Sequence, residues 1–412
     1  MGMPNNNEER EKADKRRLRF WNFITPIVEK WLKLKFNFTY SDFKPETIEG
    51  PVLVAINHTC AYDPIFIGAA FKGKPLNFIC SEHLLRVKTW GPFLDKYCWL
   101  IPHQKGARGS RTALVAMKRI KRGASVFLAV EGEQTWDGLS LPVMPYTGKL
   151  VKGSGATLIT YMLEGAYLSA PRWSMSTRKG KVYGHPVNVY SPETLKEMSD
   201  EEVEAVIAKD LWFDTWEWQK TRQDGPVIYK CKEGGNAGGL ERAVFSCPSC
   251  GAFGTLSSQD DSIGCSCGFK ARMSDTGFFE PAEPFETIVD WEKLDRKALA
   301  ERMEAMKSGQ SKAADETDLL FADDNVILYH IKDDHEEEEA ACGRLTLRHE
   351  DGEFILSIGE HRFSLADISN MTMVLAARVV FSDKNGYYEL RAQKGSVTNL
   401  RKYVIARELI KE

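Results

Sequence analysis

The sequence has no long uncharged apolar segment. Nowhere in its 412 residues does a run approach the roughly 20 residues needed to cross a bilayer. The first residues, MGMPNNNEEREK, lack the apolar core of a secretory signal peptide. We also find no internal repeat. These absences predict a cytoplasmic protein. Any membrane contact is expected to be peripheral and on the cytosolic face.

Acidic residues are missing between Asp95 and Glu131, although the net charge of the whole chain is only −3. This segment carries eight lysines and arginines instead. We therefore expect this part of the chain to attract anions.

The chain is too long for a single compact core. At about 100 to 200 residues per domain, it should contain two or three domains. Changes in composition predict five segments: an amphipathic, membrane-associating N-terminal segment (1–44), an α/β domain (45–224), a small ribbon around four cysteines (225–280), a helical linker (281–317) and a C-terminal β domain (318–412).

Residues 20–36, FWNFITPIVEKWLKLKF, place apolar side chains at helical spacing after the basic run KADKRRLR. Such a helix is suited to lie flat in a lipid interface, with its bases near anionic headgroups. The alternative is an ordinary amphipathic helix packed on the next domain. Pro26, with Thr25 as a candidate cap, predicts that the helix begins or kinks there.

Short apolar runs alternate with helical stretches over residues 50–190. The clearest runs are VLVAI (52–56), SVFLAV (125–130) and TLITYML (157–163). This alternation predicts an α/β domain with a largely buried sheet. One helix from Ser191 to about Lys220 is expected to close the domain.

The C-terminal residues 318–412 contain several short alternating runs, among them NVILYHI and EFILSI, followed by one helix, NLRKYVIARELI. This order predicts a small β-barrel or sandwich capped at one end. The pattern resembles pleckstrin-homology (PH) and GRAM-like domains, which bind lipids or proteins.

The strongest chemical signal is NHTCAYDP at 57–64, where an apolar strand ends. A histidine at a strand end faces a cleft more readily than the core. The carboxylate of Asp63, five residues after His58, is placed to bond one ring nitrogen and to support the imidazolium that forms when the base takes a proton. His58 and Asp63 are therefore the predicted catalytic pair.

Three residues of this motif have structural alternatives. Asp63 precedes Pro64 and so has the position of a helix N-cap. His58 could instead be a satisfied structural histidine. Cys60 lies inside the motif as a potential nucleophile, but a buried thiol needs no chemistry.

The motif resembles the first motif of the glycerolipid acyltransferase family, which includes the lysophosphatidate acyltransferases: Asn-His, four residues, then Asp-Pro. The resemblance covers about residues 45–175 and implies a mixed-sheet α/β acyltransferase domain. It implies that His58, oriented by Asp63, deprotonates an acceptor hydroxyl, which attacks an acyl thioester without an acyl-enzyme intermediate. Asn57 is carried over as a substrate-binding residue.

Three further motifs extend the resemblance and supply candidate substrate-binding residues. IPHQKG offers Lys105 where the family has an arginine, a point charge in place of a two-pronged guanidinium. VEGEQTWDG keeps Glu131, expected to reach the cleft, and Gly132, but has Gln134 where the family has its second arginine. LITYMLEGAYLSAPRW ends in Arg172, a substitute phosphate ligand or one half of a structural ion pair.

A cysteine cluster is the second strong signal. Cys247 and Cys250 form one close pair, and Cys265 and Cys267 form another. Two thiolate pairs joined by a short hairpin suit tetrahedral Zn²⁺, and four thiolates make a closed, structural site that resembles a zinc ribbon. Metal-free reduced cysteines or a disulfide are the alternatives. The 14 residues between the pairs contain no lysine or arginine, so nucleic acid is not an expected partner.

Taken together, the sequence predicts an acyltransferase that moves a fatty acyl group from acyl-CoA or acyl-carrier protein to the hydroxyl of a lysophospholipid such as lysophosphatidate. Two alternatives stay open. The first is a catalytically inactive acyltransferase-like protein that binds lipid or carrier. The second is an adaptor acting through the ribbon and the C-terminal domain.

Overall fold

The structure is a computed structural model. It describes residues 7–89, 91–105, 110–309, 318–332, 336–393 and 395–411. Residues 310–317 of the expected linker lie outside the described residues. The chain divides into two compact units, the first ending at Lys230. Each unit is described by itself.

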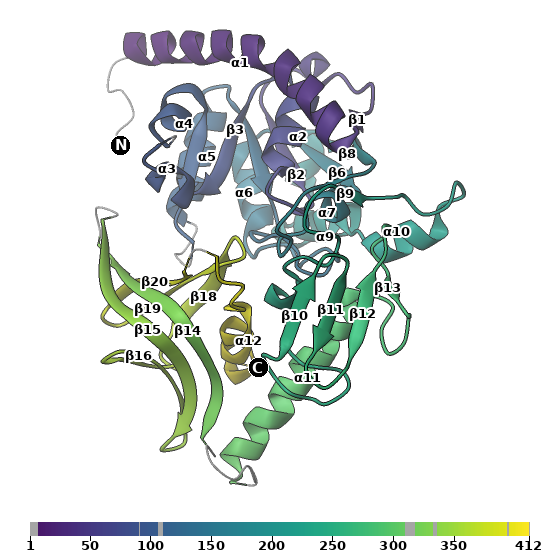
Figure 1. Cartoon of the computed structure of the whole chain (residues 1–412). Helices are drawn as coiled ribbons and strands as arrows, with labels where there is room; N and C mark the ends of the chain where they lie inside the picture. The colour runs from purple at the N-terminus through teal and green to yellow at the C-terminus, as the bar shows by residue number, and fades with distance from the viewer. Residues whose placement is uncertain are drawn as a thin grey trace. The chain divides into compact units, whose positions relative to one another are not determined.

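A long N-terminal helix, α1 (Asn7–Phe36), runs along the outside of the first unit, where it contacts α2 and α4 (Figure 1). It begins well before the expected residue 20, because the preceding basic residues are good helix formers. Pro26 lies inside α1, so it does not mark the start of the helix.

The first unit is built on a seven-stranded mixed sheet with strand order β1-β8-β6-β2-β5-β3-β4. Neighbouring strands are parallel except β6 and β8, which are antiparallel. This is the mixed-sheet α/β domain that the sequence predicts. The strands are β1 (Phe38–Tyr40), β2 (Val52–Ile56), β3 (Leu76–Ser81), β4 (Leu100–His103), β5 (Ser125–Ala129), β6 (Thr157–Glu164) and β8 (Val182–Tyr190).

Helices cover both faces of this sheet. Along β2, every residue is buried, and alternate side chains enter two separate apolar cores, Val54 facing one and Leu53 the other. Burial on both faces explains why the central strands read as continuous apolar runs. The other helices are α2 (Asp63–Ala70), α3 (His83–Arg86), α4 (Gly91–Tyr97), α5 (Ser110–Ile120), α6 (Thr147–Ser154), α7 (Ala166–Ser169), α8 (Pro192–Glu197), α9 (Asp200–Leu211) and α10 (Thr215–Thr221).

The single helix expected between residues 191 and 220 is wrong: α8, α9 and α10 occupy this stretch. Ser199 and Glu202 form a capping box that starts α9, and Asp214 caps α10 through the amides of Trp216 and Glu217. Each cap satisfies amides at the start of a new helix, so the chain breaks there.

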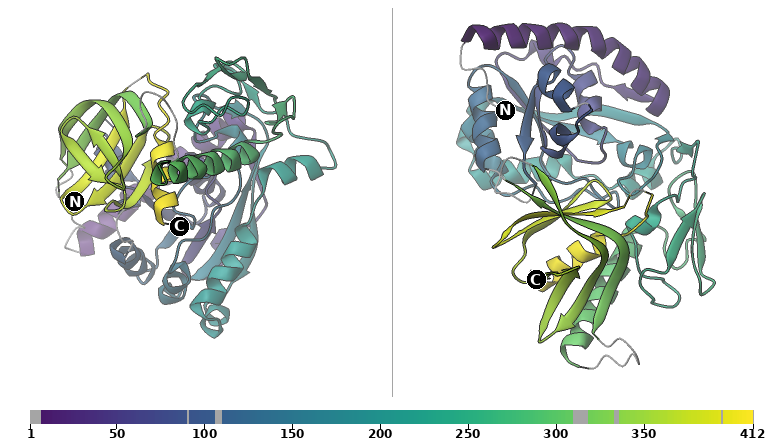
Figure 2. Two further views of the ribbon diagram at one scale, coloured as in Figure 1. Left: turned by 90° about the horizontal axis from the view of Figure 1, so that it is seen from below. Right: turned by 60° about the vertical axis from the view of Figure 1, so that its left-hand side comes forward.

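The second unit contains a four-stranded antiparallel sheet, a long helix and a seven-stranded antiparallel sheet of order β17-β16-β15-β14-β20-β19-β18. The final helix packs against β18 and the long helix (Figure 2). The elements are β10 (Leu256–Gln259), β11 (Ser262–Cys265), β12 (Lys270–Met273), β13 (Phe279–Glu280), α11 (Ile288–Lys307), β14 (Leu319–Ile331), β15 (Glu337–Glu350), β16 (Glu353–Ile358), β17 (His361–Ser364), β18 (Ser369–Val374), β19 (Arg378–Asp383), β20 (Gly386–Ala392) and α12 (Arg401–Lys411).

Within the described residues, no helix is both long enough and apolar enough to cross a membrane.

Candidate functional site

The sheet brings the first and third motifs to one edge. β2 and β5 are parallel neighbours, with Ile56 paired to Ala129 at their carboxyl ends. The segments that follow these strands therefore emerge side by side. His58 lies two residues beyond β2, and Glu131 lies two residues beyond β5.

The imidazole of His58 is oriented by Asp63. Nδ1 of His58 lies 2.8 Å from Oδ2 of Asp63. Asp63 is fully buried, whereas 17% of the His58 side chain is exposed. No described residue forms a hydrogen bond with Nε2 of His58. When Nδ1 carries the proton toward the carboxylate, Nε2 keeps a lone pair that can accept a proton from a substrate.

The carboxylate of Asp63 is held by its own loop. Oδ2 also accepts from the amides of Thr59 (2.7 Å) and Cys60 (3.0 Å), and Oδ1 accepts from the Thr59 hydroxyl (2.9 Å) and the Cys60 thiol (3.2 Å). Asp63 is not the helix cap suggested by its position, because α2 begins at Asp63 and its N-cap is Tyr62. The carboxylate instead closes the loop around His58.

Cys60 is a buried partner of this carboxylate. Burial raises the pKa of its thiol well above the usual range, and the neighbouring charge of Asp63 raises that pKa further. A thiol kept protonated is a poor nucleophile. This supports the structural alternative for Cys60.

Glu131 is buried, and its two oxygens bind the backbone. Oε1 accepts from the amide of His58 (3.1 Å), and Oε2 accepts from the amide of Leu141 (2.9 Å). Burial raises the pKa of Glu131 to about 8, although both backbone hydrogen bonds oppose this shift. We expected this carboxylate to reach the cleft, but the structure uses it to tie the loop of His58 to the loop after β5.

Gly132 allows that loop to turn. Its φ is +70°, and an added Cβ would lie 2.3 Å from Sδ of Met144. A larger residue would therefore meet both backbone strain and a clash. The side chain of Met144 fills the space that a Cβ at position 132 would occupy, and no ligand is needed to explain the glycine.

Asn57 is almost completely buried and is bound to the neighbouring strand. Its Nδ2 donates to the Leu163 carbonyl (3.1 Å), and its Oδ1 accepts from the Leu163 amide (2.9 Å). We expected Asn57 to bind substrate. In the structure its amide fixes the end of β2 against β6 and so positions the residue before His58.

Arg172 lies beside the loop after β5. Its Nη1 donates to Oε2 of Glu133 (3.1 Å) and to the Gln134 carbonyl (3.1 Å), and its guanidinium stacks over the Trp136 ring at 4.5 Å. Only 2% of its side chain is exposed. Of the two alternatives predicted for Arg172, this geometry fits the ion pair.

Lys105 is grouped with the second unit, where its carbonyl accepts from the Tyr387 hydroxyl (3.0 Å). It is therefore not among the residues that the first unit brings together around His58.

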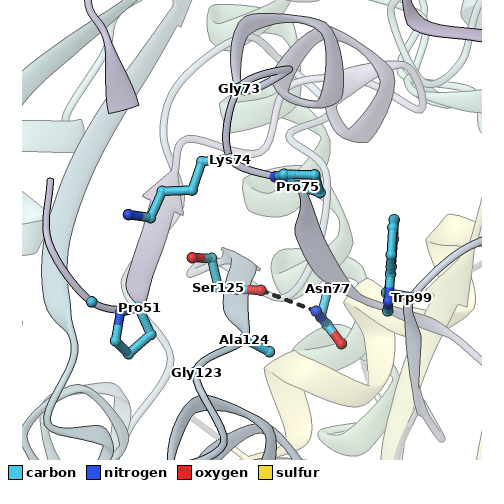
Figure 3. Close-up of a pocket in the computed structure, with 10 residues that line it drawn as sticks. Pro51, Gly73, Lys74, Pro75, Asn77, Trp99, Gly123, Ala124 and Ser125 are labelled. Carbon is cyan, nitrogen blue, oxygen red and sulfur yellow. Dashed lines mark hydrogen bonds between the residues drawn. The ribbon is translucent and has the colours of Figure 1, made fainter. Parts of the chain in front are cut away.

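A hollow of about 420 Å³ lies at the opposite edge of the sheet (Figure 3). It is lined where β2, β3 and β5 begin, so the length of β2 separates it from His58. Asn77 in its wall donates to the Ser125 carbonyl (3.3 Å) and accepts from Arg119 (2.7 Å). These groups already satisfy one another, and we assign the hollow no role in the chemistry.

The four cysteines of the cluster converge as the sequence predicts. Their sulfur atoms all lie within 4.8 Å of one another. The Cys247–Cys267 and Cys250–Cys265 pairs are 3.6 and 3.9 Å apart. Zinc–sulfur bonds of about 2.3 Å in a tetrahedron require sulfurs roughly 3.8 Å apart, so the arrangement fits a tetrahedral metal ion.

The helix α11 holds the segment that precedes the cysteine cluster. The buried carboxylate of Asp295 accepts from the amides of Phe245 (2.9 Å) and Ser246 (2.8 Å), and Nε1 of Trp291 donates to the Ser246 carbonyl (2.9 Å). The segment that leads into Cys247 is therefore held by the helix.

Sequence reasoning missed the residues that hold the predicted site residues in place around His58. Leu141 and Leu163 contribute only backbone groups, so no side-chain signal marks them. Glu133 could have been found, because the structural ion pair considered for Arg172 requires an acidic partner and Glu133 is an acid in the neighbouring motif. Thr59 could also have been found, as a hydroxyl within one turn of Asp63.

Two of three comparisons with known proteins find a similarity. Residues 35–164 match the model of the family described as Acyltransferase. The chain is similar to the solved 1-acyl-sn-glycerophosphate (LPA) acyltransferase PlsC from Thermotoga maritima, with 20% identity, coverage of 53% of this chain and 85% of that one, and a TM-score of 0.41. A search of curated proteins finds no match.

The first unit thus carries a mixed α/β domain with a histidine–aspartate pair at the carboxyl edge of its sheet. The match to the family described as Acyltransferase, over residues 35–164, falls within this domain.

Proposed function

We propose that this acyltransferase moves a fatty acyl group from a thioester donor, acyl-CoA or acyl-carrier protein, to the hydroxyl of a lysophospholipid such as lysophosphatidate. The observation that carries the proposal is the His58–Asp63 pair, 2.8 Å apart, with the imidazole partly exposed. This is the arrangement required of a general base at a protein surface that meets substrate.

In the proposed reaction, Nε2 of His58 takes the proton of the acceptor hydroxyl while the hydroxyl oxygen attacks the thioester carbonyl. The buried carboxylate of Asp63 stabilises the imidazolium that forms. The tetrahedral intermediate collapses, the carbon–sulfur bond breaks, and the leaving thiolate takes the proton from Nε2. An ester and a free thiol result, and His58 is regenerated.

The remaining predicted residues support this pair in different ways. Asn57, Glu131 and Gly132 act as positioning residues, since their contacts are with the protein. Arg172 is our candidate contact for an acceptor phosphate, in competition with Glu133. Lys105 remains a proposed second phosphate contact on charge alone.

The test is acyl transfer by the full chain to a panel of lysolipids, measured as thiol release and as lipid product. His58→Ala should lower kcat by a factor on the order of 10² to 10⁴. The matched control is His185→Ala, because His185 also pairs with a carboxylate in this unit, Glu164 at 3.3 Å. Equal turnover in both variants would remove His58 from the mechanism. Lysolipid binding without thiol release from the unaltered chain would favour the inactive alternative.

We propose that α1 attaches the enzyme peripherally to the cytosolic face of a membrane. Phe23, Ile27, Trp31 and Leu34 are exposed along one side of this helix. At its carboxyl end, the Lys35 ammonium donates to the Tyr62 hydroxyl (3.2 Å), and Tyr62 immediately precedes Asp63. A lipid-facing helix would therefore end at the catalytic loop.

We propose that the second unit combines a zinc ribbon, the helical linker and a PH-like domain. Cys247, Cys250, Cys265 and Cys267 would hold one structural Zn²⁺, and the seven-stranded sheet followed by α12 supports the PH-like assignment.

Metal analysis of the purified chain tests the ribbon. We expect one zinc per chain, released by chelation together with a loss of folded structure confined to the second unit. Cys250→Ser should abolish retention of the metal. Cys342→Ser, at an exposed cysteine outside the cluster, should leave it unchanged. Absence of zinc from the unaltered chain after metal-supplemented expression would contradict the assignment.

A further inference from the structure

A hollow of about 450 Å³ lies between the first turns of α1 and the end of α4. Its lining combines bases with aromatic rings. The residues are Lys12, Lys15, Arg16, Arg19, Phe20, Phe23 and Tyr97. No step of the proposed reaction uses this hollow.

The bases around the hollow keep their positive charge uncompensated. Lys12, Lys15 and Arg19 are exposed and form no ion pair with a described carboxylate. Their neighbour Arg17 differs, because it pairs with Asp14 at 3.6 Å. The hollow is therefore a concentrated positive site suited to a phosphate group.

The walls of the hollow are fixed to the first unit. Arg17 donates to the Asp95 carbonyl (3.0 Å), and Nε1 of Trp99 donates to Oδ1 of Asp14 (3.0 Å). The rings of Phe20 and Tyr97 meet at 5.0 Å. The spacing of the bases is thus set by tertiary contacts as well as by the helix.

Apolar side chains continue from the hollow along the same helix. Phe23 belongs to the lining and is 70% exposed, and Ile27, Trp31 and Leu34 follow at helical spacing on the same exposed side. A soluble anion or an acidic carrier protein would use the bases but not this stripe. A bilayer surface offers phosphate groups and apolar chains together.

We propose that this hollow binds the phosphate headgroup of an anionic phospholipid while the adjoining stripe enters the acyl region of the same leaflet. The inference rests on the membrane attachment put forward above. It adds a discrete headgroup site and a requirement for anionic lipid. Tyr97 and Phe20 form the floor of the site, and the four bases surround the phosphate.

The chain provides a matched control for general charge. Lys30 and Lys33 are exposed on α1, eighteen residues after Lys12 and Lys15, which is about five turns at 3.6 residues per turn. They lie on the same helix, beyond Pro26, and outside the hollow. Through charge alone, the two pairs should contribute equally to binding at an anionic surface.

The experiment measures binding of the full chain to vesicles of phosphatidylcholine alone and of phosphatidylcholine mixed with phosphatidylglycerol. Lys12→Gln/Lys15→Gln should weaken binding to the mixed vesicles about tenfold more than Lys30→Gln/Lys33→Gln. Neither pair should change the weak binding to phosphatidylcholine. Ile27→Ser/Trp31→Ser should lower binding to both kinds of vesicle.

Equal losses in the two lysine pairs would overturn the proposal, because the bases would then act only as diffuse charge. Inorganic phosphate binding that Lys12→Gln/Lys15→Gln abolishes, with vesicle binding unchanged in the same variant, would assign the hollow to a soluble anion instead. Selective loss of acyl-carrier protein binding, with vesicle binding intact, would assign it to the carrier. Because these assays require no turnover, normal vesicle binding by a chain without acyl transfer would refute the catalytic proposal and leave this one standing.

Discussion

Two buried carboxylates follow neighbouring strands of the first unit, and the structure uses them differently. Asp63 meets an imidazole, a hydroxyl, a thiol and two amides. Glu131 accepts hydrogen bonds from two backbone amides, and its pKa is raised by burial and by the nearby charge of Asp63. A buried acid at a strand end can thus either orient a reacting group or hold together the loops that carry it. The donors around it decide which.

The difference can be tested by replacing each carboxylate with its amide. Asparagine fits at position 63 if its oxygen takes the Oδ2 site. Its amide group then faces the Thr59 hydroxyl and the Cys60 thiol, both of which can accept a hydrogen bond. Glutamine fits position 131 less well. Both oxygens of Glu131 accept from backbone amides, so the NH₂ group of a glutamine would have to face one of these donors.

Asp63→Asn should have the larger effect on catalysis. The fold is preserved, but the imidazolium loses its counter-charge, so we expect kcat to fall about 10²-fold, a barrier increase of about 2.7 kcal/mol. Steady-state kinetics with an unchanged melting temperature would show this. Normal kcat in a folded variant would mean that the charge of Asp63 takes no part in the reaction.

Glu131→Gln should act mainly on stability. One glutamine N–H must oppose a backbone N–H, and leaving such a buried donor unsatisfied costs about 1 to 3 kcal/mol. We expect the free energy of unfolding to fall by this amount, with kcat changed less than about threefold under conditions where the variant is folded. A selective loss of kcat would instead give Glu131 a catalytic role.

The pH dependence of stability separates the two acids further. Burial raises the pKa of Glu131 to about 8, so the folded state holds this proton at pH values where the unfolded state has released it. Stability should therefore fall as pH rises from about 5 to 8, by up to about 1.4 kcal/mol per unit. Glu131→Gln should reduce this slope by the contribution of Glu131 and leave that of Asp295, whose pKa burial raises to about 7. An exposed control, Glu197→Gln on α8, should keep the whole slope.

The sequence was sufficient to predict the His58–Asp63 pair because the loop between β2 and α2, the first loop, is built from local contacts. His58 and Asp63 are five residues apart, and the donors to Asp63 lie between them. The local signal also existed where one helix was wrongly expected, since Ser199 and Glu202 form a recognisable capping pair.

The loop after β5, the second loop, depends on contacts that the spacing of residues in the sequence does not reveal. The role of Glu131 follows from the pairing of β2 with β5 and from an amide ten residues later, and the partner of Arg172 lies 39 residues before it in sequence. The motifs predicted that Glu131 would reach the cleft and that Arg172 would bind a phosphate or form an ion pair. Only the strand register determines what each one contacts.

Glu133→Gln tests whether Arg172, the arginine beside the second loop, contacts the acceptor phosphate. Glu133 is 30% exposed, so solvent screens its pairing with Arg172, and removing its charge should have a modest effect. If Arg172 contacts an acceptor phosphate, the variant should lower KM for lysophosphatidate about threefold and leave kcat unchanged. The zwitterionic acceptor lysophosphatidylcholine serves as the control, because its quaternary amine already offsets the phosphate charge. An equal change for both acceptors would mean that Arg172 only supports the loop through Glu133 and Trp136. The two carboxylates of the second loop, Glu131 and Glu133, would then share a purely structural role.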